Sequence, residues 1–175
     1  MMSELYLRCF RSIWALLFVL SCFVEIVLFS RNPLTMPLEY WVIHSYYIRV
    51  YLNTVFIIFS IYRTKRLRSA FTLCAVRTGL KEYEKYFEKC SGMNVLLYFV
   101  LAILPLLLLN LNRVESVLPL IVYLVFSIWL LLLFEEIYKR IASERLPEKT
   151  VYLPLLINLA VSAVQSPFFY SLFGR

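Results

Sequence analysis

The chain has 175 residues, 62% of which are hydrophobic, and its formal net charge at pH 7 is +7. A soluble domain of this size cannot bury so much apolar surface, whereas a lipid bilayer can accommodate it. The basic residues lie beside hydrophobic runs, which is typical of membrane topology rather than of nucleic-acid binding. The sequence therefore predicts an all-α, polytopic membrane helix bundle that forms a single transmembrane domain over residues 1–175.

Hydrophobic runs predict five transmembrane helices. The first run is longer than the apolar region of a signal peptide, and no small-x-small cleavage site follows it. The link at 110–116 is so short that the helices on either side of it must form an antiparallel hairpin. We expect the spans over residues 13–29, 43–62, 93–109, 117–134 and 150–170.

The fourth predicted helix should continue into water beyond its apolar run. Glu135 and Lys139 have i,i+4 spacing, and so do Glu136 and Arg140. Pairs of this kind, with the acidic residue first, stabilise a solvent-exposed helix. We therefore expect two ion pairs along one helix just outside the bilayer.

Basic residues set the expected orientation. Of the 18 Lys and Arg residues, all but Arg31, Arg49, Arg113 and Arg175 fall on one side if the five spans are correct. The positive-inside rule makes that side cytoplasmic. The N-terminus is then cytoplasmic and the C-terminus is outside. We expect a multi-pass protein of the plasma membrane, which in bacteria is the inner membrane.

Two ionisable residues fall inside predicted spans. Glu25 lies before the outer end of the first span and Arg49 after the outer start of the second, so both are about 8 Å below the same interface. Consecutive spans are antiparallel, which makes a salt bridge between them geometrically natural. The pair could fix the packing of two helices, each side chain could snorkel separately, or the two could line a substrate path.

The sequence carries no recognisable catalytic or metal-binding motif. It lacks a Ser/His/Asp set, a H-E-x-x-H motif and a P-loop, and it has a single histidine, His44. The four cysteines form no C-x-x-C pair, so we expect neither a metal nor another cofactor. The amides Asn53, Asn158 and Gln165 within spans predict interhelical hydrogen bonds. We therefore do not expect the chain itself to be an enzyme.

A polar segment at 63–92 separates the second and third predicted spans. Apolar residues recur at helical spacing on both sides of Gly79, which predicts two short amphipathic helices lying flat on the cytoplasmic face. The segment could simply anchor the loop through its basic residues, or it could dock a cytoplasmic partner. Lys and Glu alternate over 81–89, which favours a protein surface over a purely lipid-binding helix. The two apolar series are Leu67, Ala70, Phe71 and Cys74, then Leu80, Tyr83, Phe87 and Cys90.

Part of this segment resembles a known family. Residues 74–89 read Cys-Ala-Val-Arg-Thr-Gly-Leu-Lys-Glu-Tyr-Glu-Lys-Tyr-Phe-Glu-Lys. The run is similar to the cytoplasmic segment after the second span of ABC-2-type exporter permeases, including small bacterial members linked to peptide or bacteriocin export and immunity. The resemblance covers about residues 47–110. In that family the segment is a coupling helix that sits in a groove of a separate ATPase.

The resemblance implies a permease-type subunit of an ATP-driven export complex, coupled to its ATPase through residues 67–90. The family usually has six spans and this chain has five, which leaves room for a second membrane subunit or a homodimer. The alternative is a non-transporting interaction protein, such as a bacteriocin immunity factor or an accessory or assembly subunit of a larger membrane complex. The residues expected to contact the partner are Phe71, Arg77, Gly79, Lys81, Tyr83, Glu84, Lys85 and Phe87.

Overall fold

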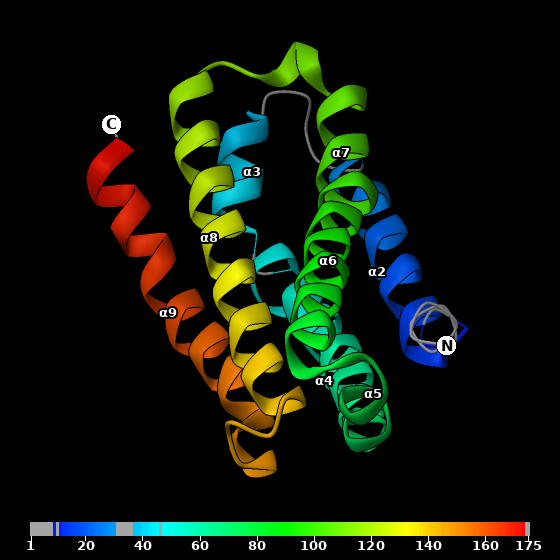
Figure 1. Cartoon of the computed structure of the whole chain (residues 1–175). Helices are drawn as coiled ribbons and strands as arrows, with labels where there is room; N and C mark the ends of the chain where they lie inside the picture. Colours follow the sequence, from blue (N-terminus) through cyan, green and yellow to red (C-terminus); the bar gives the residue numbers. More distant parts are fainter. Residues whose placement is uncertain (1–8, 10, 31–36, 46, 174–175) are drawn as a thin grey trace.

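The structure, a computed structural model, describes residue 9 and residues 11–30, 37–45 and 47–173, and the regular elements of this part of the chain are all helices, with no strand. The expectation of an all-α fold is therefore confirmed (Figure 1). In chain order the elements are α2 (Ile13–Ser30), α3 (Leu38–His44), η1 (Tyr47–Leu52), α4 (Asn53–Ser69), α5 (Phe71–Thr78), α6 (Leu80–Tyr98), η2 (Phe99–Ile103), α7 (Leu104–Leu109), η3 (Leu111–Arg113), α8 (Val117–Ala142), η4 (Glu148–Tyr152) and α9 (Leu153–Phe173).

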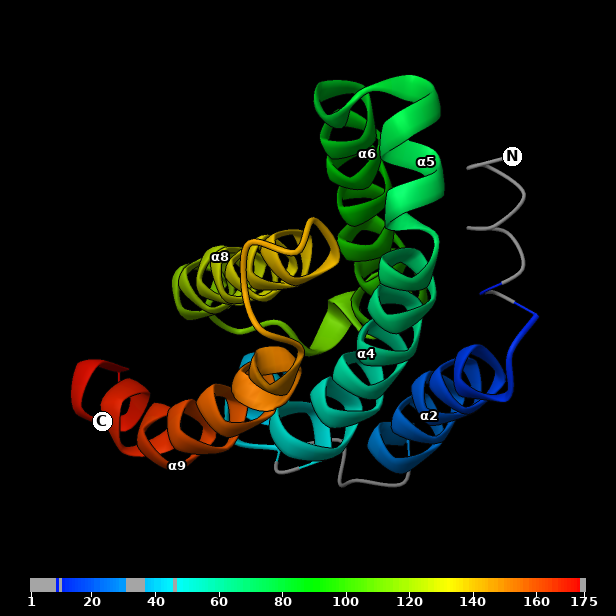
Figure 2. The same cartoon turned by 60° about the horizontal axis from the view of Figure 1, so that its bottom comes forward.

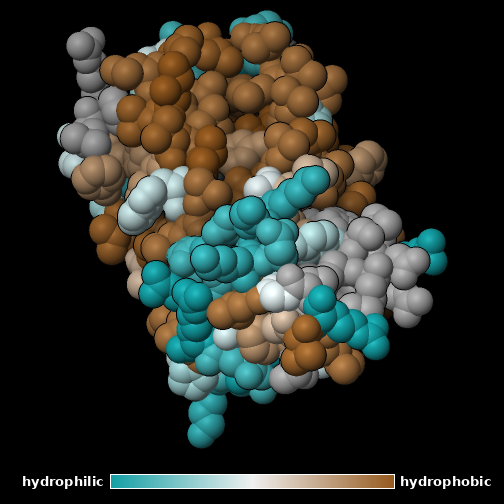
Figure 3. Space-filling model, in the orientation of Figure 1, coloured by the Kyte–Doolittle hydropathy of each residue, from teal (hydrophilic) through white to brown (hydrophobic). Residues whose placement is uncertain are grey.

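Three stretches of helix are long and apolar enough to cross a membrane, namely Leu80–Leu109, Val117–Ala142 and Glu148–Phe169. The helix at Ile13–Phe29 is also apolar but shorter. The predicted span at 43–62 is not among the three candidates. These features make the chain compatible with membrane insertion. Figure 3 agrees, because apolar residues cover the upper part of the molecule and polar residues gather toward its lower end.

The helices pack side by side around α4 and α8. Helix α4 contacts α2, α8 and α9, and α8 also contacts α6 and α9. Helix α8 also runs antiparallel to the long helix that contains α6, and in Figure 1 the link after α7 leads to the start of α8 at the top of the view. The link lies between Leu109 and Val117, so the hairpin expected from its short length is confirmed.

The structure corrects the expected layout of the polar segment. Leu80 starts a helix that continues through η2 and α7 to Leu109, so residues 80–90 are the first turns of a long helix rather than a separate helix lying flat. Before Pro105, nothing in this stretch breaks a helix, since Gly92 alone only weakens one. One buried stripe at helical spacing runs along it, formed by Tyr83, Phe87, Cys90, Asn94 and Tyr98. Likewise, α4 extends to Ser69, beyond the expected end of the second span.

The long helix widens into the π-helical turn η2 just before Pro105. Proline has no N–H, so it cannot bond the carbonyl of Leu101, and a wider turn relieves this loss. A second π-helical segment, η1, precedes α4 and contains Arg49. It contains no proline, and nothing in its local sequence explains the wider turn. Both π-helical segments pack against α2.

A buried carboxylate caps the start of α8. Glu39, on the short helix α3, accepts hydrogen bonds from the backbone N–H groups of Ser116, at 2.7 Å, and Glu115, at 3.4 Å. The first N–H groups of a helix have no partner within it, and the positive end of the helix favours an anion. Glu39 therefore holds α3 against the N-terminal end of α8. No pattern in the sequence pointed to this role for Glu39.

Candidate functional site: the basic hairpin and the ion pair beneath it

Helix α5 and the start of α6 form a helical hairpin, which we define as residues 71–90 and call the basic hairpin. Figure 2 shows α5 lying along the first turns of α6. Gly79 joins them with φ +85° and ψ 149°, a backbone conformation that is essentially restricted to glycine. The rings of Phe71 and Tyr83 meet edge to face at 5.1 Å between centroids, which closes the two helices on each other.

A buried ion pair lies where the basic hairpin enters the bundle. Arg63 of α4 pairs with Glu135 of α8, and their side chains are 0% and 2% exposed. The Ser91 hydroxyl donates to the Glu135 carboxylate at 2.8 Å, and the Ser60 hydroxyl does so at 3.3 Å. The Asn94 amide donates to it at 3.5 Å. The Glu135 carboxylate thus accepts hydrogen bonds from side chains of α4 and α6, and so links both helices to α8.

The arginine of this pair also contacts the basic hairpin directly. The Arg63 guanidinium carbon lies 5.2 Å from the centre of the Phe87 ring, within the range of a cation–π interaction. The Tyr83 hydroxyl donates to the carbonyl oxygen of Leu67 at 3.3 Å. Tyr83 and Phe87 therefore hold α6 against α4 from the inside.

The prediction of an ion pair between Glu135 and Lys139 is wrong. Glu135 lies on the buried face of α8 with Leu131, Tyr138 and Ala142, at spacings of three and four residues, so its side chain points into the bundle. Lys139 instead pairs with Glu136 at 2.7 Å. The sequence did hold a signal, since Glu135 falls within an apolar stripe.

The second ion pair expected on α8 is confirmed. Arg140 Nε donates to the Glu136 carboxylate at 3.0 Å, with i,i+4 spacing. Both side chains are partly exposed, so this pair contributes little to stability. The helix also continues to Ala142, past the apolar run, as expected.

Further polar contacts tie the basic hairpin and α4 to the end of α8. Lys139 pairs with Glu88 at 3.0 Å, and Arg145 pairs with Glu84. Arg68 Nη1, at the end of α4, donates to the carbonyl oxygens of Ile141 at 3.0 Å and Leu146 at 3.2 Å. A cation at this position also suits the negative end of the α8 dipole. Beyond the buried pair, two ion pairs thus hold the base of the hairpin to the end of α8, and Arg68 holds α4 there.

The structure divides the residues expected to contact a partner. Arg77, Gly79, Lys81 and Lys85 are exposed, whereas Phe71 and Glu84 are half-buried. Tyr83 and Phe87 are each only 1% exposed, because they pack against α4. The expectation that these two aromatics face outward is therefore wrong: α6 turns that face toward its own bundle.

Two exposed apolar residues of the hairpin, Leu73 and Val76, were not singled out from the sequence, and a third, Leu80, was placed in an apolar series but not among the partner contacts. Leu73 is 63% exposed, Val76 is 87% exposed and Leu80 is 44% exposed. Leu73 and Val76 share one face of α5, and Leu80 follows directly after the Gly79 turn. We call these three residues the apolar tip. Figure 3 shows apolar atoms among the polar residues at the lower end of the molecule.

Predicted hydrogen bonds between helices are present for two of the three amides that were expected within spans. The Tyr98 hydroxyl donates to Asn53 Oδ1 at 2.6 Å, and Asn53 Nδ2 donates to Asn158 Oδ1 at 3.2 Å. This chain of bonds joins α6, α4 and α9 next to both π-helical segments. Its role is structural, because polar groups in a bilayer must find partners within the protein.

Glu25 is fully buried on α2, and its carboxylate oxygens have no hydrogen-bond partner among the residues that the structure describes. The side chain of Arg49 is not among the parts of the chain that the structure describes, so the salt bridge between Glu25 and Arg49 stays a prediction. We expect Glu25→Ala and Arg49→Ala each to lower the free energy of unfolding by about 1–3 kcal/mol, because each leaves a charge unpaired at membrane depth. A double-mutant cycle in detergent micelles measures the coupling, and purely additive effects would show that the pair does not form.

No group of histidine, cysteine, aspartate and glutamate that could hold a metal ion occurs within the described part of the chain. Comparison with family models, with curated proteins and with solved structures finds no match to this chain. Its function must therefore be inferred from the site.

Proposed function

We propose that this chain is a permease-type subunit of an ATP-driven export complex in a bacterial inner membrane, with five spans, a cytoplasmic N-terminus and an external C-terminus. Coupling to a separate ATPase runs through residues 67–90. The observation that carries the proposal is the basic hairpin: an exposed apolar tip on a base that is fastened to α4 and α8. Such an element is suited to receiving force from a partner and passing it into the bundle.

The chemistry of the hairpin surface favours a protein partner. Leu73, Val76 and Leu80 offer an apolar centre, and the exposed Arg77 and Lys81 lie beside it. An apolar centre with a charged rim is the usual composition of a protein interface. The matching surface on the ATPase would be an apolar groove with an acidic rim, because complementary charges steer and orient the two partners.

The charge balance of the hairpin supports an acidic partner. Glu84 and Glu88 are paired with Arg145 and Lys139 of the same chain. Glu82 lies near Lys85 at 3.5 Å, and both are largely exposed. The exposed charges of the hairpin are mainly basic, since Glu82 and Glu88 are outnumbered by Arg77, Lys81, Lys85 and Lys89.

Force applied at the tip would reach the bilayer along α6. This helix runs without interruption from Leu80 into the membrane-spanning stretch that ends at Leu109. The pair of Arg63 and Glu135 joins it, through Ser91, to α4 and α8. A displacement of the tip would therefore move three helices together rather than bend a loop.

The proposed topology predicts a labelling pattern. Asn112 and Lys81 are both exposed, the first in the link between α7 and α8 and the second on the basic hairpin. In a cysteine-free background, Asn112→Cys is expected to react with an impermeant thiol reagent on intact cells. Lys81→Cys should react only after the membrane is permeabilised. Labelling of Lys81→Cys on intact cells would show that the orientation is the opposite one. The hairpin would then lie outside the cell, where it could not contact a cytoplasmic ATPase.

The proposal is tested by purifying the tagged chain in mild detergent and identifying the chains that accompany it. We expect a soluble subunit with a P-loop whose ATP hydrolysis rate changes when the membrane chain is present. The alternative role, a non-transporting immunity factor or accessory subunit, predicts no such ATPase and protection that does not depend on ATP. If the hairpin only anchors the chain, it should bind vesicles containing anionic lipid and no protein partner.

A further inference from the structure

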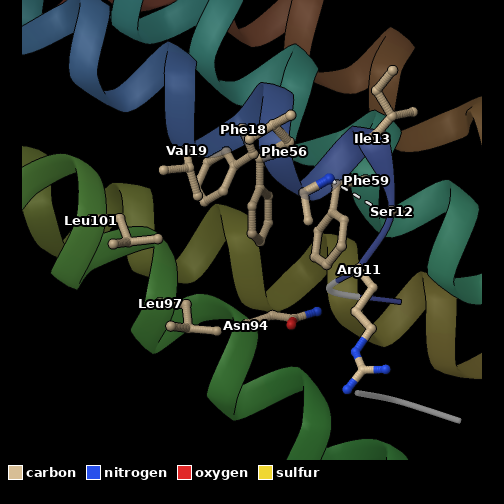
Figure 4. Close-up of a pocket in the computed structure, with 12 residues that line it drawn as sticks. Arg11, Ser12, Ile13, Phe18, Val19, Phe56, Phe59, Asn94, Leu97 and Leu101 are labelled. Carbon is tan, nitrogen blue, oxygen red and sulfur yellow. Dashed lines mark hydrogen bonds between the residues drawn. The ribbon is translucent and has the colours of Figure 1, made fainter. Parts of the chain in front are cut away.

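An apolar groove of about 560 Å³ opens between α2, α4 and α6, and its volume is within the usual range for a small-molecule site. Figure 4 shows Phe18, Phe56 and Phe59 directed across the groove toward Leu97 and Asn94. Most of the other lining side chains are aliphatic, namely Ile13, Ala15, Leu16, Val19 and Leu101. The groove therefore offers an apolar wall beside the exposed apolar surface of α2.

The polar groups of this groove gather at one end. Arg11 is exposed there, beside Ser12, which accepts a hydrogen bond from the Ala15 N–H at 3.3 Å and so caps α2. The positive end of the α2 dipole points in the same direction. No acidic residue is among the groove's lining residues in the described part of the chain. A ligand matched to the whole groove is apolar along its length and anionic at this end.

We propose that the groove binds one anionic phospholipid of the bilayer, with an acyl chain between α2 and α6 and the phosphate beside Arg11. Charge complementarity selects this occupant: an apolar helix of a second copy would leave Arg11 without a counter-charge, whereas a phospholipid supplies both the chain and the anion. Asn94 connects the groove to the buried ion pair, because its amide donates to Glu135 at 3.5 Å. The bound lipid would thus adjoin the contact that joins α4, α6 and α8.

The lipid proposal does not depend on the ATPase, and it is tested with the purified full chain by native mass spectrometry. Phosphatidylglycerol and phosphatidylcholine with identical acyl chains are titrated into the detergent-solubilised protein. We expect one tightly held phosphatidylglycerol, bound about fivefold more strongly than phosphatidylcholine, which is the contribution of one cation near the headgroups. Arg11→Gln should remove this preference, while Lys149→Gln, at an exposed basic site that does not line the groove, should leave it intact.

A second pair of variants tests the groove itself. Val19→Trp fills the groove and should abolish the bound lipid, whereas Leu20→Trp, at a similarly exposed residue of α2 that does not line it, should not. Equal retention of the two lipids, or equal retention by the two tryptophan variants, would show only non-specific lipid around the protein and would overturn the proposal. A dimer that carries no lipid would overturn it too, because the groove would then belong to an interface between copies.

Discussion

Glu135→Gln is expected to lower the free energy of unfolding by about 3–5 kcal/mol, because it removes the buried counter-charge that Glu135 provides to Arg63. The arginine is 0% exposed and cannot turn into water without opening the contact between α4 and α8. The substitution keeps the shape of the side chain, so the loss reports on charge rather than on packing. Equilibrium unfolding of the purified protein in mixed micelles measures it.

The adjacent residue provides a matched control for Glu135→Gln. Glu136→Gln makes the same chemical change one position along α8, in a carboxylate that is 41% exposed and pairs at the surface. Its effect should be within about 1 kcal/mol, as for other exposed pairs. Replacing both buried partners, as in Arg63→Met with Glu135→Gln, should recover part of the loss. Equal stability of the Glu135→Gln and Glu136→Gln variants would mean that Arg63 and Glu135 do not form a buried pair.

The second large effect concerns the apolar tip. Val76→Glu is expected to weaken ATPase binding by about 2 kcal/mol or more, roughly 30-fold, because it places a carboxylate at the desolvated centre of the proposed interface. Val76 is the most exposed large apolar residue of the hairpin, at 87%, so the substitution disturbs no internal packing. Glutamate also has a higher helix propensity than valine, which protects α5. Co-purification at a series of protein concentrations measures the change.

The controls separate loss of the partner from loss of the fold. Val76→Leu keeps the site apolar and should bind the ATPase nearly as well as the natural chain. Unfolding of the Val76→Glu variant in mixed micelles should match that of the natural chain. Full binding by Val76→Glu would show that the tip is not part of the interface.

The sequence was sufficient where a local pattern decides the structure. The short link at 110–116 fixed the hairpin of α7 and α8, and α8 continued past its apolar run. Asn53 and Asn158 formed interhelical hydrogen bonds because amides within apolar helices have few other partners. The positions of these residues along the chain are enough to predict these features.

The sequence was insufficient where two positions on one helix compete for the same face. Glu135 and Glu136 both precede a cation at i,i+4, and only the packing of α4 and α6 against α8 decides which of them turns inward. In the same way, Tyr83 and Phe87 have the spacing of an exposed interfacial face and of a buried one. Their burial followed from the continuity of α6, which depends on contacts with α4 that lie far away in the sequence.

The polar segment at 63–92 shows the same limit for helix boundaries. Its charge suggested a separate element outside the bilayer, yet helices α4 and α6 extend into it from both sides. Gly79 was correctly placed at the turn, because its positive φ suits glycine. Charge indicates which residues meet water, whereas the ends of helices are set by residues that break them.

Site-specific photo-crosslinking in cells tests most directly whether the apolar tip contacts an ATPase. A photoreactive amino acid is placed at Val76, and at Leu156 of α9 as a control, since Leu156 is 63% exposed on a helix that is long and apolar enough to cross a membrane. We predict a covalent adduct at position 76 with a subunit identified by its P-loop peptide, and no such adduct at position 156. Adducts at position 76 with lipid alone, or the same adducts at both positions, would contradict the proposed docking of the basic hairpin.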